Sequence, residues 1–477
     1  MTSPLRQVRG LFRSVRRNVR FRPFDPDTEE GRARERYRRA ALTAIASGGA
    51  RLISLATVVV SVPLTLGHLG AERYGAVVTI TALTGMLIFA DFGLGNGLMN
   101  LVASASGRNS PELAKRSISS AFFVLCGIAA ILAVPFSILY LVIPWASFLN
   151  VSSRVSAQEI AAAVGVFLAS VLVNLPLGVV QRVQLAYQRG FVNGLWSAVG
   201  SLCALAALYA AIRLDLGLPW IVFALVSGPI IGNLLNGASL FWIERPDLRP
   251  RWSLATPREG RQLARVGFLF FVLQLTVAIA FQSDVVVAAK VIGPQAATDY
   301  SVTFRLFMFV PTLVNLLLLP MWPAYAESIA RGDAAFVGRT LRVSVAIATV
   351  LSGVSSLILV LLGPLAIRLW VGSSVNTTLP LLLGMAVWAV LSNGFNAVAM
   401  LLNGANVIRF QIATALSMTV VSIVSSAVLG SIYGVAGVIW GTVLAYVICT
   451  AIPTAIYLPR VLARLQHSPD RAIASAT

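Results

Sequence analysis

The hydrophobic pattern of this chain is a series of long apolar segments separated by short polar breaks. From residue 44 onward each apolar segment is about 20 residues long, enough for a helix to cross roughly 30 Å of hydrocarbon. The pattern predicts twelve membrane-spanning helices, at residues 46–68, 75–100, 117–141, 157–181, 191–212, 219–243, 265–288, 297–322, 339–363, 379–402, 409–431 and 435–458. The expected fold class is therefore an all-α integral membrane protein.

Composition supports a membrane protein and argues against several other classes. Hydrophobic residues make up 57% of the chain and charged residues 12%, whereas about a quarter of a soluble protein is charged. The three cysteines, Cys126, Cys203 and Cys449, each lie inside an apolar segment, so neither a disulfide framework nor a metal site is expected. His68 and His467 are the only histidines, which disfavours histidine-based catalysis.

The basic residues are distributed unevenly between the two sides of the predicted helices. With the N-terminus placed in the cytoplasm, the segments on that side hold 30 of the 37 lysines and arginines, and the outer loops hold five. This bias supports an even number of helices with both termini in the cytoplasm. It also accounts for the net charge of +19 without a nucleic-acid partner.

The N-terminal segment, residues 1–43, is strongly basic. Twelve arginines lie within its first 41 residues. Six of them alternate with apolar residues at three- and four-residue spacing, which are Leu5, Val8, Phe12, Val15 and Val19. This spacing is typical of an amphipathic helix that lies on anionic lipid. A basic tail that only fixes the topology is the alternative. The segment lacks the apolar core of a cleaved signal peptide.

The connection at residues 244–264 divides the chain into two sets of six helices, at 44–243 and 265–458, with a tail at 459–477. The two sets resemble each other at offsets near 220. The matching stretches are Gly70 to Gly75 with Gly293 to Ser301, Tyr187 to Phe191 with Gly404 to Ile408, and Leu216 to Leu218 with Tyr433 to Val435. Because six is even, the repeat is parallel, and we expect two pseudo-symmetric lobes around a central cavity.

Two motifs resemble a known family. The first half has Leu69-Gly70-x-x-x-Tyr74-Gly75, followed by a helix that closes with Ala90-Asp91-Phe92-Gly93-Leu94-Gly95-Asn96. The second half has Ser283-Asp284 before Ile292-Gly293-Pro294, and then Tyr300 to Leu306. Over residues 44–458 the chain resembles the polysaccharide flippases of the multidrug/oligosaccharidyl-lipid/polysaccharide exporter superfamily.

The resemblance implies a function in the bacterial plasma membrane. Similar proteins move undecaprenyl-diphosphate-linked oligosaccharide to the outer leaflet for O-antigen, capsule or exopolysaccharide assembly, by alternating access. Drug exporters and lipid II flippases of the same superfamily are the alternatives. The lipid II branch usually has fourteen helices, whereas twelve are predicted here, and arginines within the spans disfavour an exporter of cationic drugs.

Two opposite-charge couples are predicted within the membrane. Arg51 and Asp91 are expected at the same depth near the cytoplasmic side, and Asp284 and Arg305 near the outer side. Ionisable residues in spans often serve function, so each couple can be a gate or coupling site, and the arginines can bind a diphosphate. The alternative is that each couple is structural, with Arg51 reaching the surface.

Amide side chains are the other candidates for a hydrated cavity. Gln274 and Gln282 lie near one face of a predicted helix, and Asn393 and Asn396 lie near one face of another. Such amides either bond helix to helix or line a cavity suited to sugar hydroxyls. Most amides in the spans are expected to serve packing, and Gly228-x-x-x-Gly232 and Gly437-x-x-x-Gly441 are predicted close-packing faces.

The predicted function is transport without covalent chemistry. No nucleotide-binding motif is present, so no cofactor is expected, and any energy is expected from an ion gradient, the membrane potential or downstream consumption of product. For an ion gradient, Asp91 or Asp284 is the candidate site for a proton or sodium ion. A membrane polymerase or ligase of polysaccharide synthesis is the alternative from another class, but no outer loop is long enough for a catalytic domain. Other polysaccharide-assembly proteins are expected partners.

Overall fold

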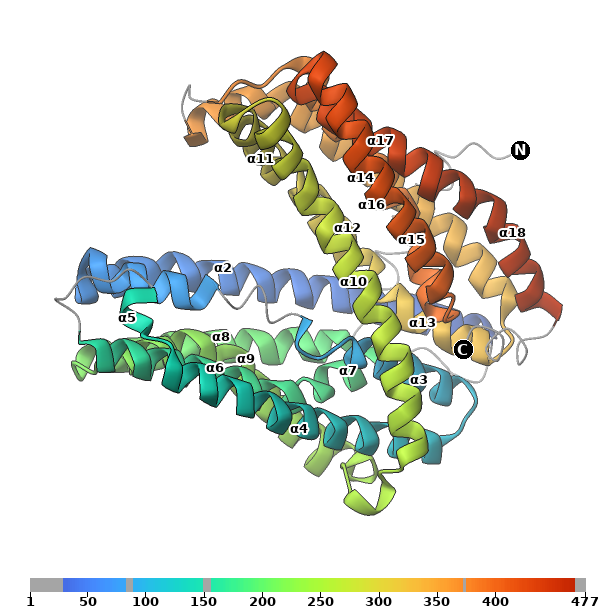
Figure 1. Ribbon diagram of the computed structural model, residues 1–477. Coiled ribbons are helices and arrows are strands. Elements are labelled where there is room, and N and C mark those ends of the chain that lie inside the picture. The colour runs from blue at the N-terminus through green and yellow to red at the C-terminus, as the bar shows by residue number, and fades with distance from the viewer. Residues whose placement is uncertain (1–28, 83–88, 149–155, 372–374, 468–477) are drawn as a thin grey trace. The chain divides into compact units, whose positions relative to one another are not determined.

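The computed structural model describes residues 29–82, 89–148, 156–371 and 375–467, and within them the chain is helical with no β-strand (Figure 1). The N-terminal helices are α2 (Glu29–Ala82), α3 (Leu94–Gly107), α4 (Pro111–Val142), α5 (Trp145–Phe148), α6 (Ala157–Leu177), α7 (Val179–Ala186), α8 (Gly190–Arg213) and α9 (Leu218–Ala238). They are followed by α10 (Pro257–Val291), α11 (Pro294–Phe307), α12 (Phe309–Leu318), α13 (Met321–Ala330), α14 (Ala334–Val371), α15 (Leu379–Gly404), α16 (Ile408–Tyr433), α17 (Val435–Tyr446) and α18 (Ile452–His467).

Eleven helical segments of the described chain are long and apolar enough to cross a membrane. Each contains one of the predicted spans. The twelfth predicted span, 75–100, lies partly outside the described residues, and its described parts fall in the end of α2 and the start of α3. The predicted amphipathic helix near the N-terminus also lies outside the described residues. The prediction of an all-α multi-pass membrane protein is confirmed.

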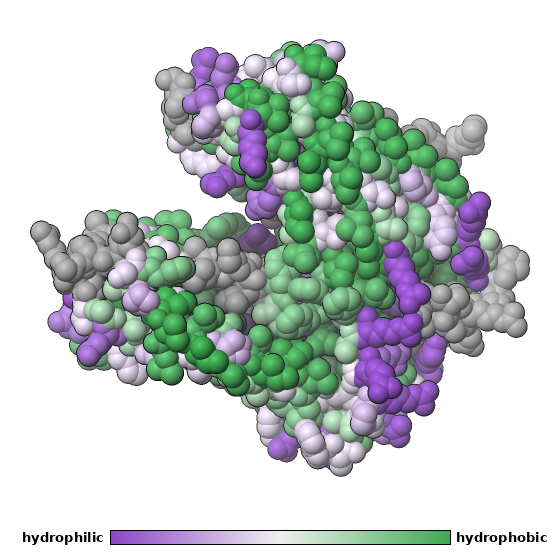
Figure 2. All heavy atoms as spheres, in the orientation of Figure 1, coloured by the Kyte–Doolittle hydropathy of each residue, from purple (hydrophilic) through white to green (hydrophobic). Residues whose placement is uncertain are grey.

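The surface of these helices is apolar, as contact with lipid requires. Leu141 of α4 and Leu369 of α14 are each 80% exposed, and Figure 2 shows apolar side chains over much of the visible surface. In water such patches would drive association. Polar side chains lie instead in the interior, among them Asn233, Asp284 and Ser426. The hydrocarbon therefore stabilises the outer faces, and the interior has to satisfy its own polar groups.

The chain divides into two compact units, which we call the N-unit and the C-unit. The N-unit comprises Arg38–Phe268, and the C-unit comprises Leu269–Thr477 with the chain up to Tyr37. The boundary lies inside α10, just beyond the predicted linker at 244–264. That connection packs within the N-unit, because the backbone N–H groups of Arg251 and Thr256 donate to Ser119 Oγ (3.2 Å) and Ser120 Oγ (3.1 Å) of α4.

The turn between α7 and α8 in the N-unit has the same hydrogen bonds as the turn between α15 and α16 in the C-unit. In the N-unit, the N–H groups of residues 187, 188 and 189 donate to the carbonyls of residues 183, 185 and 184. In the C-unit, those of 405, 406 and 407 donate to 401, 403 and 402. The middle residues, Gln188 and Asn406, both have positive φ, at 56° and 58°. The local backbone geometry thus agrees with a repeat, but it pairs Tyr187 with Ala405 rather than with the predicted Gly404.

The C-terminal tail begins later than the sequence predicted. We expected the last helix to end near residue 458 and the tail to begin at 459. Helix α18 instead continues through Pro459 to His467. Five residues of π-helix, Val447–Ala451, join α17 to α18, so the apolar segment runs continuously from Val435 to Leu465.

Small residues bring neighbouring helices into backbone contact, as predicted for the two glycine pairs. A Cβ added to Gly232 would lie 2.8 Å from the Trp196 carbonyl oxygen of α8. A Cβ added to Gly441 would overlap the Ser426 backbone nitrogen of α16. Close approach of this kind replaces the hydrophobic drive that lipid removes between helices. Both predicted close-packing faces are confirmed.

Gly441→Ala is therefore expected to destabilise the C-unit. The new methyl group would meet backbone atoms of α16, and overpacking of this kind costs about 1–3 kcal/mol. The thermal midpoint of the purified protein in detergent measures the loss. Gly353→Ala in α14 is the control, because nothing lies within 4 Å of the added Cβ and alanine favours the helix. Equal midpoints for the two variants would contradict the packing.

Candidate functional site

The strongest candidate site is a buried carboxylate in the C-unit. Asp284 of α10 is 3% exposed, and its Oδ2 accepts hydrogen bonds from the Tyr300 hydroxyl of α11 (2.7 Å) and the Thr442 hydroxyl of α17 (2.8 Å). Its other oxygen, Oδ1, is buried without a hydrogen-bond partner. The carboxylate is therefore only half satisfied, which is costly for an ionised group away from water.

Further oxygen atoms surround Thr442. Its hydroxyl lies 3.1 Å from Ser422 Oγ and 3.2 Å from Ser426 Oγ, both on α16. The Ser426 hydroxyl in turn donates to the Val438 carbonyl at 2.8 Å. One carboxylate, three aliphatic hydroxyls, a phenol and a carbonyl thus form a compact cluster of oxygen atoms. We call Asp284, Tyr300, Ser422, Ser426, Val438 and Thr442 the Asp284 cluster.

The helix packing described above positions this cluster. Gly437 and Gly441 let α17 lie directly against α16, so that Ser426 and Thr442 come within hydrogen-bonding distance. Apolar side chains close the other sides, because Tyr300 and Val438 belong to a fully buried hydrophobic core. The oxygens therefore form a polar island within an apolar unit.

The cluster is suited to a proton or a hard monovalent cation. Hard cations prefer oxygen ligands, and carboxylate, hydroxyl and carbonyl oxygens are all present. In the described part of the chain, histidine, cysteine and carboxylate side chains form no group of three that would suit a transition metal. Either a proton on Asp284 or a bound cation would satisfy the bare Oδ1. This arrangement is consistent with the coupling role predicted for Asp284.

The predicted pairing of Asp284 with Arg305 is wrong. Arg305 also lies on α11, but its side chain is exposed, and no ion pair joins it to Asp284 among the described residues. The buried face of α11 carries Tyr300, Thr303 and Phe307. At about 100° per residue, Arg305 is turned roughly 140° from Tyr300. The hydrophobic pattern placed Arg305 on the right helix but did not predict the face on which it lies.

The equivalent place in the N-unit has no carboxylate. Ser61 precedes Gly70 by the same number of residues as Asp284 precedes Gly293, and both glycines have positive φ. Ser61 lines a cavity of about 320 Å³, together with Thr65, Tyr74 and Asn174 among others. None of the residues lining this cavity is acidic. The buried carboxylate therefore belongs to one half of the repeat only.

Asp91 has a different partner and a different backbone from those predicted. It lies in a turn before α3 rather than in a continuous helix, because Phe92 and Gly93 both have positive φ. Its carboxylate accepts from the N–H groups of Gly93 (2.9 Å) and Gly95 (3.3 Å), at the start of α3. Its ion pair is with Arg182 of α7, with 3.8 Å between Arg182 Nη2 and Asp91 Oδ2.

The predicted pair of Arg51 and Asp91 is therefore wrong. The Arg51 side chain is exposed on α2. Arg182 instead takes the place beside Asp91 and also donates to Asn96 Oδ1 at 2.8 Å. A predicted span that ended at residue 181 left Arg182 in a loop, although α7 begins at Val179 and includes it. A role for Arg51 in transport stays a prediction.

The amide candidates lie in different environments. Gln274 is partly buried and Gln282 is exposed. Asn393 is buried and bonds the Ala389 carbonyl of its own helix at 2.7 Å, whereas Asn396 donates to Asn315 of α12 at 2.9 Å. The last two serve local and helix-to-helix bonding in this structure. Whether any of the four contacts a substrate stays a prediction.

The N-unit contains two amide chains that join its helices. Gln181 donates to Asn233, which donates to Asn174, at 2.7 and 3.0 Å. One turn further along, Gln184 donates to Asn236, which donates to Asn193, at 3.0 and 2.9 Å. Amides in lipid need such partners, so these chains are consistent with the packing role expected for most of them.

Two site residues, Tyr300 and Thr442, carried no recognisable signal of their own. Thr442 lies 158 positions from Asp284 in the chain, and a single hydroxyl in an apolar segment does not reveal a partner. Tyr300 was singled out only as part of a repeat motif. Its place nearly two turns after the start of α11 and its distance of 16 residues from Asp284 point to a contact across the α10–α11 turn.

Comparison with known proteins gives the family and the fold. The model of the family described as polysaccharide biosynthesis protein matches residues 42–329. A proposed O-antigen export protein of Yersinia pseudotuberculosis is 24% identical over 309 residues, which cover 61% of this chain and 66% of that protein. A proposed O-antigen transporter of Salmonella typhimurium is 24% identical over 277 residues, covering 56% and 60%. The chain thus spans about two thirds or less of these relatives.

Solved structures show the same fold at low identity. A MOP superfamily transporter from Pyrococcus furiosus has a TM-score of 0.72 and 15% identity, with 90% of this chain and 97% of that chain covered. A MATE transporter of Vibrio cholerae has a TM-score of 0.71 and 17% identity, covering 91% and 98%. These values establish the MOP transporter fold and nothing finer.

Arg182→Gln is expected to destabilise the N-unit and Arg51→Gln is not. Arg182 bonds Asn96 and lies beside Asp91, so its loss leaves a carboxylate without its cation at the start of α3, at a cost of about 1–3 kcal/mol. Thermal midpoints of the two variants in detergent, compared with the unmodified protein, measure this. A larger loss for Arg51→Gln than for Arg182→Gln would restore the pairing predicted from the sequence.

Proposed function

The chain belongs to the polysaccharide biosynthesis protein family, and from that premise we propose that it moves a lipid-linked saccharide across a membrane. The observation that carries this proposal is the combination of that family with the MOP transporter fold over 90% of the chain. The names of the two relatives, an O-antigen export protein and an O-antigen transporter, support the same kind of cargo. The activity is transport rather than catalysis.

The proposed cargo is undecaprenyl-diphosphate-linked oligosaccharide, moved by alternating access in the bacterial plasma membrane. An amphiphile of this kind has a polar part that needs a hydrated path and a lipid part that can stay in the hydrocarbon. The excess of basic residues on one side, 30 against five, supports cytoplasmic termini. Both features agree with a substrate assembled on the cytoplasmic face and used outside.

The Asp284 cluster is the proposed coupling site. With Asp284 ionised, its bare Oδ1 and the surrounding hydroxyls favour uptake of a proton or sodium ion. With the ion released, the buried charge favours a rearrangement that exposes or re-pairs the carboxylate. Gly293, with φ of 135°, lies between Asp284 and Tyr300 and permits a change in the α10–α11 angle. The ion gradient would thereby bias the direction of transport.

Transport can be tested in proteoliposomes loaded with a lipid-linked oligosaccharide. The purified protein is expected to make inner-leaflet oligosaccharide accessible to an external glycosidase, faster than in protein-free vesicles. A fluorescent cationic drug is tested in parallel. Drug transport without exposure of the oligosaccharide would support the exporter alternative and contradict the proposal.

Asp284→Asn is expected to remove the response of transport to an imposed proton or sodium gradient. The variant keeps the size of the side chain but can neither ionise nor bind a cation by charge. Asp215→Asn is the matched control, since the Asp215 side chain is 94% exposed. An undiminished gradient response in Asp284→Asn, at equal protein levels, would rule out the coupling role.

Thr442→Val tests the hydroxyl half of the same cluster. The hydrogen bond that Thr442 donates to Asp284 stabilises the ionised carboxylate, so its loss is expected to strengthen proton binding about tenfold, because hydrogen bonds to charged groups contribute roughly 1.5–3 kcal/mol. Thr442→Ser keeps the hydroxyl and is expected to bind the proton about as tightly as the unmodified protein. The sodium or proton concentration for half-maximal transport is the measurement, and equal values for valine and serine would contradict the assignment.

A further inference from the structure

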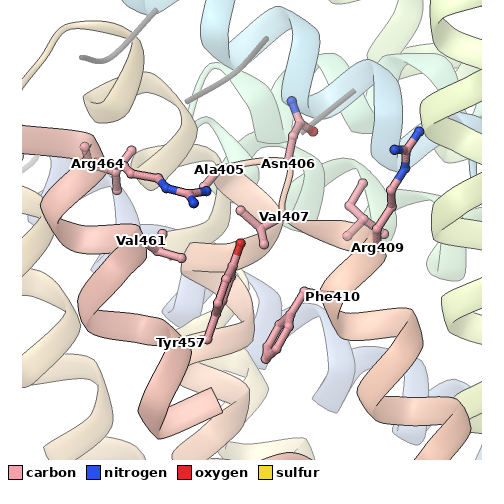
Figure 3. A pocket seen from close by; sticks show the side chains of 10 residues that line it. Ala405, Asn406, Val407, Arg409, Phe410, Tyr457, Val461 and Arg464 are labelled. Carbon is pink, nitrogen blue, oxygen red and sulfur yellow. The ribbon is translucent and has the colours of Figure 1, made fainter. Parts of the chain in front are cut away.

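A small pocket lies in the C-unit between the turn that joins α15 to α16 and the extended helix α18. Its volume is about 120 Å³, and its walls include Ala405, Arg409 and Phe410 from the turn and Tyr457 and Arg464 from α18 (Figure 3). It shares no residue with the Asp284 cluster. The mechanism proposed above makes no use of it.

The pocket combines a rigid aromatic wall with an arginine. The rings of Phe410 and Tyr457 stack with their centroids 4.3 Å apart and an angle of 19° between their planes. Arg464 extends from α18 toward the turn at Ala405 (Figure 3). None of the ten residues that line the pocket is acidic. Within the part of the chain that the structure describes, Arg464 has no acidic partner.

At the turn between α7 and α8, which corresponds to this turn in the N-unit, carboxylates of the protein neutralise the nearby arginines. There Arg189 forms an ion pair with Glu244, and Arg245 forms a two-bond ion pair with Asp247 at 2.9 and 3.0 Å. The hydrogen bond from Arg245 lowers the pKa of Asp247, so this carboxylate stays charged. The positive charges of this turn are thus balanced from within the protein.

In the C-unit, residues without a carboxylate stand at the corresponding positions. Counted from the first residues of α9 and α17, Val461 and Arg464 take the places of Glu244 and Asp247. Both of the new residues line the pocket. The equivalence is one of position in the sequence, because Asp247 lies in a 3-10 turn whereas Arg464 lies in the continuous helix α18. Beside its shared turn the N-unit therefore has carboxylates, and the C-unit has an apolar wall with an added positive charge. An anion from outside the described chain would supply the missing charge.

We infer that this pocket binds a phosphate group at the membrane surface, carried either by an anionic phospholipid or by free phosphate. The volume equals roughly four water molecules at about 30 Å³ each, which suits a single phosphate. The planar fork of Arg464 matches two phosphate oxygens. Arg464 lies at the end of the apolar segment Val435–Leu465, where arginine and tyrosine side chains reach lipid headgroups.

Native mass spectrometry of the purified full chain tests the inference. The protein is released from nanodiscs of phosphatidylglycerol and phosphatidylcholine, and the bound lipids are counted. The unmodified protein is expected to retain phosphatidylglycerol in preference, and Arg464→Gln to retain it about tenfold less. Arg460→Gln removes the same charge one turn earlier on α18, from a residue that does not line the pocket, and should retain it normally.

The source of the phosphate is distinguished by a second arm. Inorganic phosphate is added to the lipid-stripped protein, and the thermal midpoint is recorded. Free phosphate is the ligand if it raises the thermal midpoint of the unmodified protein and of Arg460→Gln but not of Arg464→Gln, and if the nanodisc experiment shows no preference for phosphatidylglycerol. Equal lipid retention and equal phosphate response in Arg464→Gln and the unmodified protein would overturn the inference. Arg464 is exposed, so folding of the variant is checked by an unchanged midpoint without ligand.

Discussion

Hydrocarbon offers no hydrogen bonds, and this single constraint governs where every polar group of the chain lies. Helices satisfy the backbone, and glycine faces bring helices close enough for side-chain hydroxyls and amides to satisfy one another. In the amide chains of the N-unit, Asn233 and Asn236 each accept one hydrogen bond and donate another, although Gln184 Oε1 has no partner. Asp284 meets the constraint only in part, because one carboxylate oxygen has no partner. This unpaired oxygen is the atom of the Asp284 cluster that could accept a proton or a cation.

The two halves of the chain treat the same backbone plan differently. Where the C-unit holds Asp284, the N-unit holds Ser61 beside a cavity without acids. Where the N-unit holds Glu244 to pair with Arg189, the C-unit holds Val461. Each half has therefore kept the turns and helix contacts and changed the charges. A protein built in this way can assign ion binding to one half and leave the other free for a different task.

Sequence reasoning predicted the helices well and the side-chain partners poorly, for a physical reason. The length of each apolar segment indicates where a membrane-spanning helix begins and ends. The four-residue spacing of Gly437 and Gly441 indicates a face on which helices pack closely. Depth in the membrane, however, does not report direction around a helix axis. Arg305 lies on the expected helix but faces away from Asp284, and Tyr300 on another face takes its place. The predicted pair of Arg51 and Asp91 was wrong for two reasons. The hydrophobic pattern does not indicate the backbone turn at Phe92 and Gly93, and it does not indicate that Arg182 of another helix lies beside Asp91.

The shared turn at Gln188 and Asn406 has a consequence for comparing the two halves. Its geometry is held by backbone hydrogen bonds, and its middle residue needs only to tolerate positive φ. Such a turn leaves most side-chain identities free, so a comparison of the two sequences understates how similar the two backbones are at this place. The main chain can therefore keep one path in both halves while the side chains around it serve different purposes.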